Sequence, residues 1–352
     1  MRRNLLIASI LAFSSFSYGQ PMTGRDFIKI LSVAKQKLPD YLSKQGFIRG
    51  EQSVNGDTVL QDYQLSSKKS AQFDDCFDRY AEGLSINNNP GFNYYTASYD
   101  EYASLLSDLK KEGFYTDGPN DQNVCLYQKD DMTLEVGSRT EDTLTYYNLF
   151  VKKQLLPSPK NIQYAEDFLG FQSHANLEYV FGRKNVQKDM YYFSDSNVVR
   201  CSVLFPNTSR QVIFIWKDEL NRCKLSHLLI GNSLRGKNSD KYDDPVAENV
   251  WTLRNGLHPN MSLSELIRVN NADIRFYSWN SQYPGIVVPA KNGNIDFKNT
   301  GVILSCLNCG SSGLMNNEVV SGDEIQNNSN RLFVLAVILM PQKDSFAAYQ
   351  NR

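Results

Sequence analysis

The sequence predicts an α+β protein built mainly of antiparallel sheets, with short helices packed on them. Three observations support this fold class. Tyr and Phe are abundant, with 20 and 19 copies, and many lie where apolar and polar residues alternate, which is typical of half-buried strands. Helical spacing of apolar residues occurs only in short stretches, most of which end at glycine. Helical and strand stretches follow one another repeatedly, so we expect two domains of this class.

The chain begins with the features of an export signal. A positively charged start precedes the apolar residues 5–13, and residues 17–19 offer the small side chains that a signal peptidase requires. The apolar run is too short to cross a bilayer, which needs about 20 residues. We therefore expect residues 1–19 to be a signal peptide that is cleaved near Gly19 and Gln20. The mature chain, with no transmembrane segment, would then be periplasmic or secreted.

Residues 20–154 predict an N-terminal α+β domain of two similar units, each a helix followed by about three strands. The first helix begins at Thr23, and Pro39 should split it because proline has no amide hydrogen to donate. The helix of each unit ends in a glycine followed by Phe, which suggests an internal duplication. These two helix ends are Gly46-Phe47 and Gly113-Phe114, and the predicted strands are 58–65, 79–86, 92–97, 124–128, 132–136 and 144–151.

Residues 155–161 contain two prolines and predict a linker, and residues 162–352 predict a C-terminal α+β domain of two α-β units. Serine N-caps mark helix starts throughout the chain, at Ser98 with Glu101, at Ser173, and at Ser262 with Glu265. Residues 332–340 are almost wholly apolar and predict a strand buried on both faces. The other predicted strands lie near 190–193, 198–205, 211–216, Trp251, 225–230, 274–279, 286–289 and 301–305.

Part of the second half resembles uncharacterised secreted proteins of Bacteroidetes-type bacteria. The resemblance covers about residues 165–290 and rests on the runs 177–186, 203–206, 213–218, 256–257 and 261–270. At residues 279–285 this chain has Trp-Asn-Ser-Gln-Tyr-Pro-Gly where the resemblance leads us to expect a glycine-rich Trp-Asp-Tyr-Gly-Gly. The repeated helix-plus-strands unit is also similar to the tandem architecture of β-lactamase-inhibitor-like envelope proteins. Neither resemblance implies a known activity.

Six cysteines in an exported chain predict disulfides, although six allow 15 pairings. Their order favours local pairs, with buried free thiols as the alternative for each. We favour the pair Cys201–Cys223 most, because it would join two predicted neighbouring strands. Cys306 and Cys309 form a C-x-x-C motif, but Gly-Ser-Ser-Gly follows it and resists helix formation. A structural loop disulfide is therefore favoured over a redox site. The predicted pairs are Cys76–Cys125, Cys201–Cys223 and Cys306–Cys309.

Common catalytic and cofactor motifs are absent from the sequence. It contains no nucleophile elbow, no H-E-x-x-H, no P-loop and no dinucleotide fingerprint, so we expect no cofactor. The three histidines are widely separated, and a structural role is favoured for each of them, so we expect no metal site. The net charge of −1 gives no electrostatic footprint for nucleic acid. These histidines are His174, His227 and His258.

Three pairs of adjacent tyrosines are the positive functional signal, because neighbours in a strand point to opposite faces. One member of each pair could form an aromatic platform for a glycan or an envelope protein, with core packing as the alternative. The leading hypothesis is therefore an exported, non-catalytic binding protein of the cell envelope, with its ligand unknown. The alternative is an envelope hydrolase, for example a glycan-directed one, with an unrecognised acid pair. The candidate binding residues are Tyr94, Tyr95, Tyr146, Tyr147, Tyr191 and Tyr192.

Overall fold

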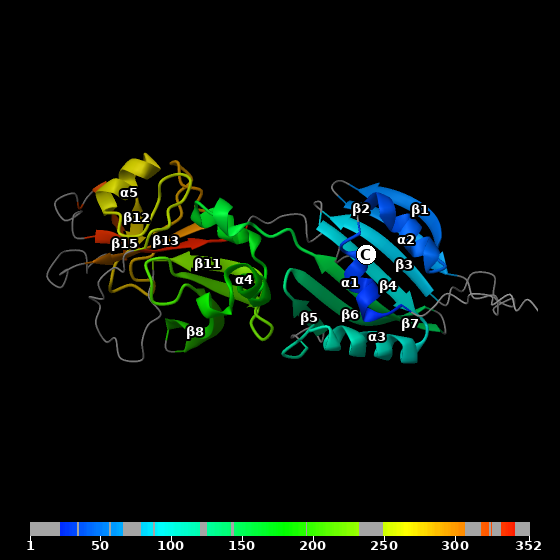
Figure 1. Cartoon of the computed structure of the whole chain (residues 1–352). Coiled ribbons are helices and arrows are strands. Elements are labelled where there is room, and N and C mark those ends of the chain that lie inside the picture. The colour runs from blue at the N-terminus through cyan, green and yellow to red at the C-terminus, as the bar shows by residue number, and fades with distance from the viewer. Residues whose placement is uncertain are drawn as a thin grey trace, which may run out of the picture. The chain divides into compact units, whose positions relative to one another are not determined.

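The fold is α+β, with two large antiparallel sheets and short helices, as predicted (Figure 1). Within the part of the chain that the computed structural model describes, no helix is both long and apolar enough to span a membrane. The chain divides into two compact units. The first comprises the residues up to Tyr115 together with Met132–Gln154, and the second comprises Thr116–Asp131 with the residues from Leu155 onward. The described residues are 22–33, 35–55, 58–65, 79–86, 89–119, 125–141, 144–194, 196–231, 249–306, 318–323, 325 and 332–341.

The seven-stranded sheet has the strand order β1-β2-β3-β4-β7-β6-β5, and every neighbouring pair whose register is defined runs antiparallel; its edge strand β5 lies in the segment Thr116–Asp131, and the other six strands belong to the first unit. Its elements are α1 (Gly24–Ile30), η1 (Lys35–Lys37), α2 (Leu38–Lys44), β1 (Ile48–Asn55), β2 (Thr58–Leu65), β3 (Arg79–Ile86), β4 (Asn89–Thr96), α3 (Tyr99–Lys111), β5 (Cys125–Lys129), β6 (Met132–Glu141) and β7 (Leu144–Lys153). The strand at 48–55, which precedes the predicted ones, gives the first copy four strands and the second three.

The two predicted helix ends have the same geometry. Gly46 and Gly113 both adopt a positive φ, of 93° and 99°, which only glycine adopts without strain. In each case the amide of the following phenylalanine donates a hydrogen bond back to a leucine carbonyl, Phe47 to Leu42 and Phe114 to Leu109, both at 3.1 Å. These are the bonds of a Schellman-type helix end. The phenylalanine is thereby turned into the core next to the helix it follows.

The first helix is divided as predicted, since α1 ends before η1 and Pro39 lies in the first turn of α2. In that position a missing amide hydrogen costs nothing. The predicted capping box at Ser98 is only half formed, because Ser98 accepts the bond from the Glu101 amide but the Glu101 carboxylate points elsewhere.

The Glu101 carboxylate is buried between α3 and the sheet, where it joins three elements. It pairs with Arg79 of β3 at 2.8 Å and accepts hydrogen bonds from the Tyr94 and Thr96 hydroxyls of β4 at 2.9 and 2.8 Å. Because a buried carboxylate is costly unless it is fully hydrogen-bonded, this arrangement fixes the position of α3 on the sheet. Burial, followed by the nearby Glu101 charge, raises the pKa of Tyr94.

The second unit contains a six-stranded sheet with the order β13-β15-β11-β10-β9-β8 and a two-stranded sheet, β12-β14. Strand β15, predicted to be buried on both faces, lies between β13 and β11, and most of its residues are buried. Trp251, predicted in a strand, lies instead in an irregular segment, where its indole donates to the Arg210 carbonyl. The elements are η2 (Pro159–Asn161), η3 (Ala165–Gly170), α4 (His174–Phe181), η4 (Arg183–Asn185), β8 (Val186–Ser194), β9 (Asn197–Leu204), β10 (Val212–Asp218), β11 (Cys223–Ile230), α5 (Leu263–Asn270), β12 (Arg275–Tyr277), β13 (Thr300–Cys306), β14 (Val319–Ser321) and β15 (Leu332–Leu339).

We expect Glu101→Gln to lower the free energy of unfolding by about 2–4 kcal/mol, because it removes the buried charge to which Arg79 and two hydroxyls are bonded. Urea unfolding followed by circular dichroism would measure this change. The matched control is Asp108→Asn on the same helix, whose exposed pair with Lys111 should be worth under about 0.5 kcal/mol. Equal losses in the two variants would contradict the role assigned to Glu101.

Candidate functional site

The predicted tyrosine pairs of the first unit divide between the two faces of the sheet. Tyr94 is fully buried on the face that carries the helices, where its ring packs against Phe27 and Phe47. Tyr147 lies on the same face and stacks on Tyr102 of α3. Tyr94 is therefore a core residue, and Tyr147 is partly buried against α3.

The opposite face of this sheet, here called the outer face, carries Tyr95 and Tyr146. In the part of the chain that the structure describes, helices α1, α2 and α3 all pack on the other face. Strand register assigns the members of the outer face. They include Asp62, Tyr80, Glu82, Leu84, Asn93, Tyr95, Glu135, Arg139, Tyr146, Asn148, Phe150 and Lys152.

A stack of two tyrosine rings and an arginine lies at the middle of the outer face. The rings of Tyr80 and Tyr95 are 4.5 Å apart at an angle of 22°, and the Arg139 guanidinium lies 4.6 Å from the centre of the Tyr95 ring. Asn93 donates hydrogen bonds to the Tyr95 hydroxyl at 2.7 Å and to Glu82 at 3.1 Å, and Tyr80 also donates to Glu82. These contacts hold the aromatic and charged groups in one arrangement before any partner arrives.

Tyr95 offers no open ring face. Tyr80 stacks on the Tyr95 ring, the Arg139 guanidinium lies 4.6 Å from the Tyr95 ring centre and 5.9 Å from that of Tyr80, and only 9% of Tyr95 is exposed. A sugar ring stacks on an open aromatic face, so Tyr95 is unsuited to that contact. The outer face instead presents ring edges, hydroxyls and charges.

The tyrosine pair of the second unit divides in the same way. Tyr191 is 4% exposed and belongs to an apolar cluster with Cys201, Val203 and Ile213, whereas Tyr192 is partly exposed. Tyr191 is therefore a core residue.

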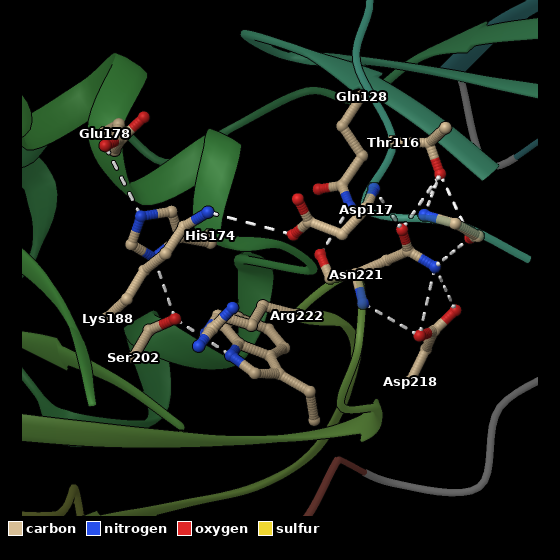
Figure 2. Close-up of polar contacts among 12 residues, drawn as sticks. Thr116, Asp117, Gln128, His174, Glu178, Lys188, Ser202, Asp218, Asn221 and Arg222 are labelled. Carbon is tan, nitrogen blue, oxygen red and sulfur yellow. Dashed lines mark hydrogen bonds and ion pairs between the residues drawn. The ribbon is translucent and has the colours of Figure 1, made fainter. Parts of the chain in front are cut away.

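A second polar arrangement, which we call the Asn221 network, lies inside the second unit (Figure 2). Asn221 follows β10 in the turn to β11 and is 4% exposed. Its side-chain oxygen accepts hydrogen bonds from the Thr116 hydroxyl and the Asp117 amide, each at 3.0 Å. Its side-chain nitrogen donates to the Gly118 carbonyl and to the Asp218 carboxylate, and its own carbonyl accepts a bond from Gln128 at 2.6 Å. Asn221 thus joins residues 116–118 and Gln128 to the turn after β10.

Beside this network, His174 lies in a chain of hydrogen bonds. Its Nδ1 lies 2.9 Å from the Ser202 hydroxyl, which also accepts a bond from the Trp216 indole at 2.9 Å. Its Nε2 lies 3.4 Å from the Glu178 carboxylate, one helical turn further along α4. With the indole as donor to Ser202, the hydroxyl donates to Nδ1, and Nε2 carries the proton that faces Glu178.

Ser202, His174 and Glu178 therefore follow the order of a hydrolytic Ser-His-acid triad, but two features oppose that chemistry. Ser202 has no exposed surface, and His174 is only 2% exposed, so a substrate carbonyl has no approach to the hydroxyl. The Trp216 indole N–H also donates a hydrogen bond to the Ser202 oxygen, the atom that would have to attack a substrate. The arrangement is a buried structural network, which agrees with the structural role predicted for His174.

The surroundings of His174 keep its ring neutral. Burial lowers the pKa of His174 to about 4, and the positive charges of Lys188 and Arg222 act in the same direction. Lys188 in turn lies 3.8 Å from Asp117, as Figure 2 shows. Since the neutral ring accepts from Ser202, protonation would disrupt the bond chain from inside the core.

The predicted disulfide between Cys201 and Cys223 is wrong, because both residues are free, buried thiols. Cys201 pairs across β9–β10 with Ile215, and Cys223 pairs across β10–β11 with Asp218. Strand β10 therefore separates them by about 10 Å, beyond the range that a disulfide bridges. Burial, followed by the charge of Asp189, raises the pKa of the Cys201 thiol to about 12.

The predicted Cys76–Cys125 pair is also wrong, because Cys125 is a free thiol; Cys76 lies outside the described residues. Cys306 is disulfide-bonded, but residue 309 lies outside the described residues, so its pairing with Cys309 stays a prediction. The expectation of export therefore rests on the leader-like first 19 residues.

Within the described ranges, no three His, Cys, Asp or Glu side chains come together in a way that could hold a metal ion. Asp296 accepts hydrogen bonds from the Lys298 amide and the Asn299 side chain, as in a turn. His227 contacts the Ser226 hydroxyl, and His258 contacts the Pro259 carbonyl.

Comparison of the chain with models of known protein families, with curated proteins and with solved structures finds no match. The class of protein that the fold defines is thus an α+β protein of two antiparallel-sheet units. Its resemblance to secreted Bacteroidetes-type proteins stays a prediction.

We expect the stability contributed by a neutral His174 to be complete above its ordinary pKa of 6.5 and to be lost as the pH falls towards 4. The loss should reach about 3 kcal/mol, because the folded state then resists protonation that the unfolded chain accepts. Urea unfolding at pH 7, 5.5 and 4.5 should show a shallower pH dependence for His174→Gln than for the wild type. The control Tyr179→Phe, on the exposed side of the same helix, should keep the wild-type dependence. Identical slopes for His174→Gln and the wild type would contradict this assignment.

We expect Asn221→Asp to lower the free energy of unfolding at pH 7 by about 3 kcal/mol, because a second carboxylate would then lie about 3 Å from Asp218. Part of the loss should be recovered near pH 4, where one of the two acids takes up a proton. Thermal unfolding at both pH values measures the effect. The exposed control Asn161→Asp should change stability by under about 0.5 kcal/mol. A loss that does not depend on pH would refute the proposed carboxylate repulsion.

Proposed function

We propose that this chain is an exported, non-catalytic protein of the bacterial cell envelope that binds a partner protein through the outer face of its first unit. The observation that carries the proposal is the stack of Tyr80, Tyr95 and Arg139 on a sheet face where none of the described helices packs. Tyrosine and arginine are the side chains most enriched where protein partners bind tightly.

The chemistry of the outer face supports a protein partner over a glycan. Tyr95 is stacked on Tyr80 and is only 9% exposed, so it offers no open ring on which a sugar could stack. Charged side chains surround the stack at fixed positions. They include Glu82, which accepts a hydrogen bond from Asn93, and the ion pair of Glu135 with Lys152 at 3.6 Å. Fixed charges around an aromatic centre suit the polar rim and buried middle of a protein interface.

A hydrolase is the second candidate, and the order Ser202-His174-Glu178 is the observation that favours it. The burial of the serine opposes it. A fluorophosphonate probe, which labels activated serines, should leave the protein unlabelled. Labelling that Ser202→Ala abolishes would establish the hydrolase and displace the binding proposal.

The binding proposal is tested by capture from envelope extract with the purified protein as bait. We expect Tyr80→Ala to reduce the captured partner at least tenfold, because it removes one ring of the stack and leaves the core face untouched. The control is Tyr179→Ala, an exposed tyrosine of α4 in the other unit, which should capture as the wild type does. Circular dichroism checks that each variant is folded. Equal capture by both variants would refute binding through the outer face, and an intact mass that begins at Gln20 would support export.

A further inference from the structure

Three tyrosine rings meet at the start of α3, on the face of the first sheet that carries the helices. Tyr147 of β7 stacks on Tyr102 of α3 with ring centres 5.1 Å apart, and the Tyr99 ring lies 5.4 Å from the Tyr147 ring at an angle of 64°. The rings of Tyr99 and Tyr102 are 6.2 Å apart. Tyr99 is 60% exposed, and the other two residues are partly exposed. We call these three residues the tyrosine platform.

The first turn of α3 holds the tyrosine platform in place. Tyr99 is the first residue of this helix and follows the N-cap Ser98, whose side chain accepts a hydrogen bond from the Glu101 amide. The Glu101 carboxylate is bonded to β3 and β4, so the same turn is fixed on the sheet. The rings are thus arranged before a ligand binds, which reduces the entropy lost on binding.

A row of hydroxyl groups continues the platform along β6 and β7. Ser138 pairs with Tyr147 across the two strands and Thr140 pairs with Thr145, so all four side chains lie on one face of the sheet. The hydroxyl oxygens of Thr140 and Thr145 are 3.3 Å apart. Ser138 and Thr140 are exposed, and Thr145 is half-buried. This surface therefore combines aromatic rings with neutral groups that both donate and accept hydrogen bonds.

We propose that the tyrosine platform binds a neutral glycan, with a sugar ring packed on Tyr99 and sugar hydroxyls bonded to the hydroxyl row. A pyranose ring has a side of C–H groups, whose slight positive charge suits the negative face of an aromatic ring. Its rim carries hydroxyl groups, which need hydrogen-bonding partners. Asp100, exposed directly after Tyr99, disfavours an acidic sugar because like charges repel. This site is separate from the outer face, so the inference does not depend on the proposed function.

The size and exposure of the platform suit a glycan better than a protein or a compact apolar ligand. A tyrosine side chain has about 200 Å² of surface, so the three rings together expose on the order of 200 Å². A standard protein interface buries about 800 Å² on each partner. A compact apolar ligand requires a concave pocket that encloses most of its surface. A glycan chain can pack a single sugar ring on one open aromatic ring, which Tyr99 provides and the 9% exposed Tyr95 does not.

The test is affinity electrophoresis of the full chain in native gels that contain hydroxyethylcellulose, laminarin, glycogen or galactomannan, all neutral polysaccharides. We expect at least one of them to retard the wild type. Tyr99→Ala should weaken that binding at least about tenfold, because it removes roughly 80 Å² of apolar contact. Tyr99→Phe keeps the ring and should stay within about threefold of the wild type. The control Tyr179→Ala, an exposed tyrosine of α4 in the second unit, should bind as the wild type does, and circular dichroism checks that each variant is folded.

Absence of retardation in all of these polysaccharides would overturn the glycan site. Equal binding by Tyr99→Ala and the wild type would also overturn it, as would an equal loss in Tyr99→Ala and Tyr99→Phe, because the ring would then not be the contact. The proposed function fails separately. Tyr80→Ala should still bind the polysaccharide, and Tyr99→Ala should still capture the protein partner, so each variant tests one surface alone.

Discussion

The side chain of Asn221 joins segments of the second unit that are about a hundred residues apart in the sequence. It uses its full hydrogen-bonding capacity, with two bonds accepted by the oxygen and the nitrogen donating to Gly118 and Asp218. These bonds hold residues 116–118, and the Asn221 carbonyl adds Gln128. Asn176 adds a bond to the Asp130 carbonyl from the start of α4. These buried amides satisfy polar groups of residues 116–118, 128 and 130 that would otherwise lack partners.

This dependence explains which parts of the fold the sequence could predict. Helix starts and stops are local, so the caps at Ser173 and Ser262 and the glycine ends at Gly46 and Gly113 were predictable from short stretches. Residues 116–118 and Gln128 instead bond to Asn221, about a hundred residues later in the sequence. Nothing near either stretch signals that contact, so the sequence placed the segment with its neighbours. The failed Cys201–Cys223 pairing has the same cause, because the order of strands β9, β10 and β11 is a non-local property.

For the tyrosine pairs, the sequence could predict that neighbours point to opposite faces of the sheet, but not which face carries the helices. Alternation in a strand requires that neighbours such as Tyr94 and Tyr95 point to opposite faces, and the structure agrees. Which face carries the helices depends on the packing of α1 and α3, which the alternation does not contain. Arg139 was missed because its role comes from reaching across β7 to a ring on β4, far away in sequence. The residues that matter on this face were identifiable only once the strand order was known.

The His174 network of the second unit and the tyrosine–arginine stack of the first unit differ in whether a partner could reach them. In the second unit, His174, Ser202 and Trp216 satisfy one another inside the core, and a lowered histidine pKa keeps that chain of bonds neutral. Such a network specifies one packing of α4 on the sheet, and changing any member leaves a buried polar group without its bond. In the first unit, the Tyr80–Tyr95–Arg139 stack is equally ordered but lies on an outer face with exposed charge at its margin. Side chains that are already held in place lose little conformational entropy on binding, so a partner gains affinity from a surface that is already arranged. The physical case for function therefore lies with the outer face.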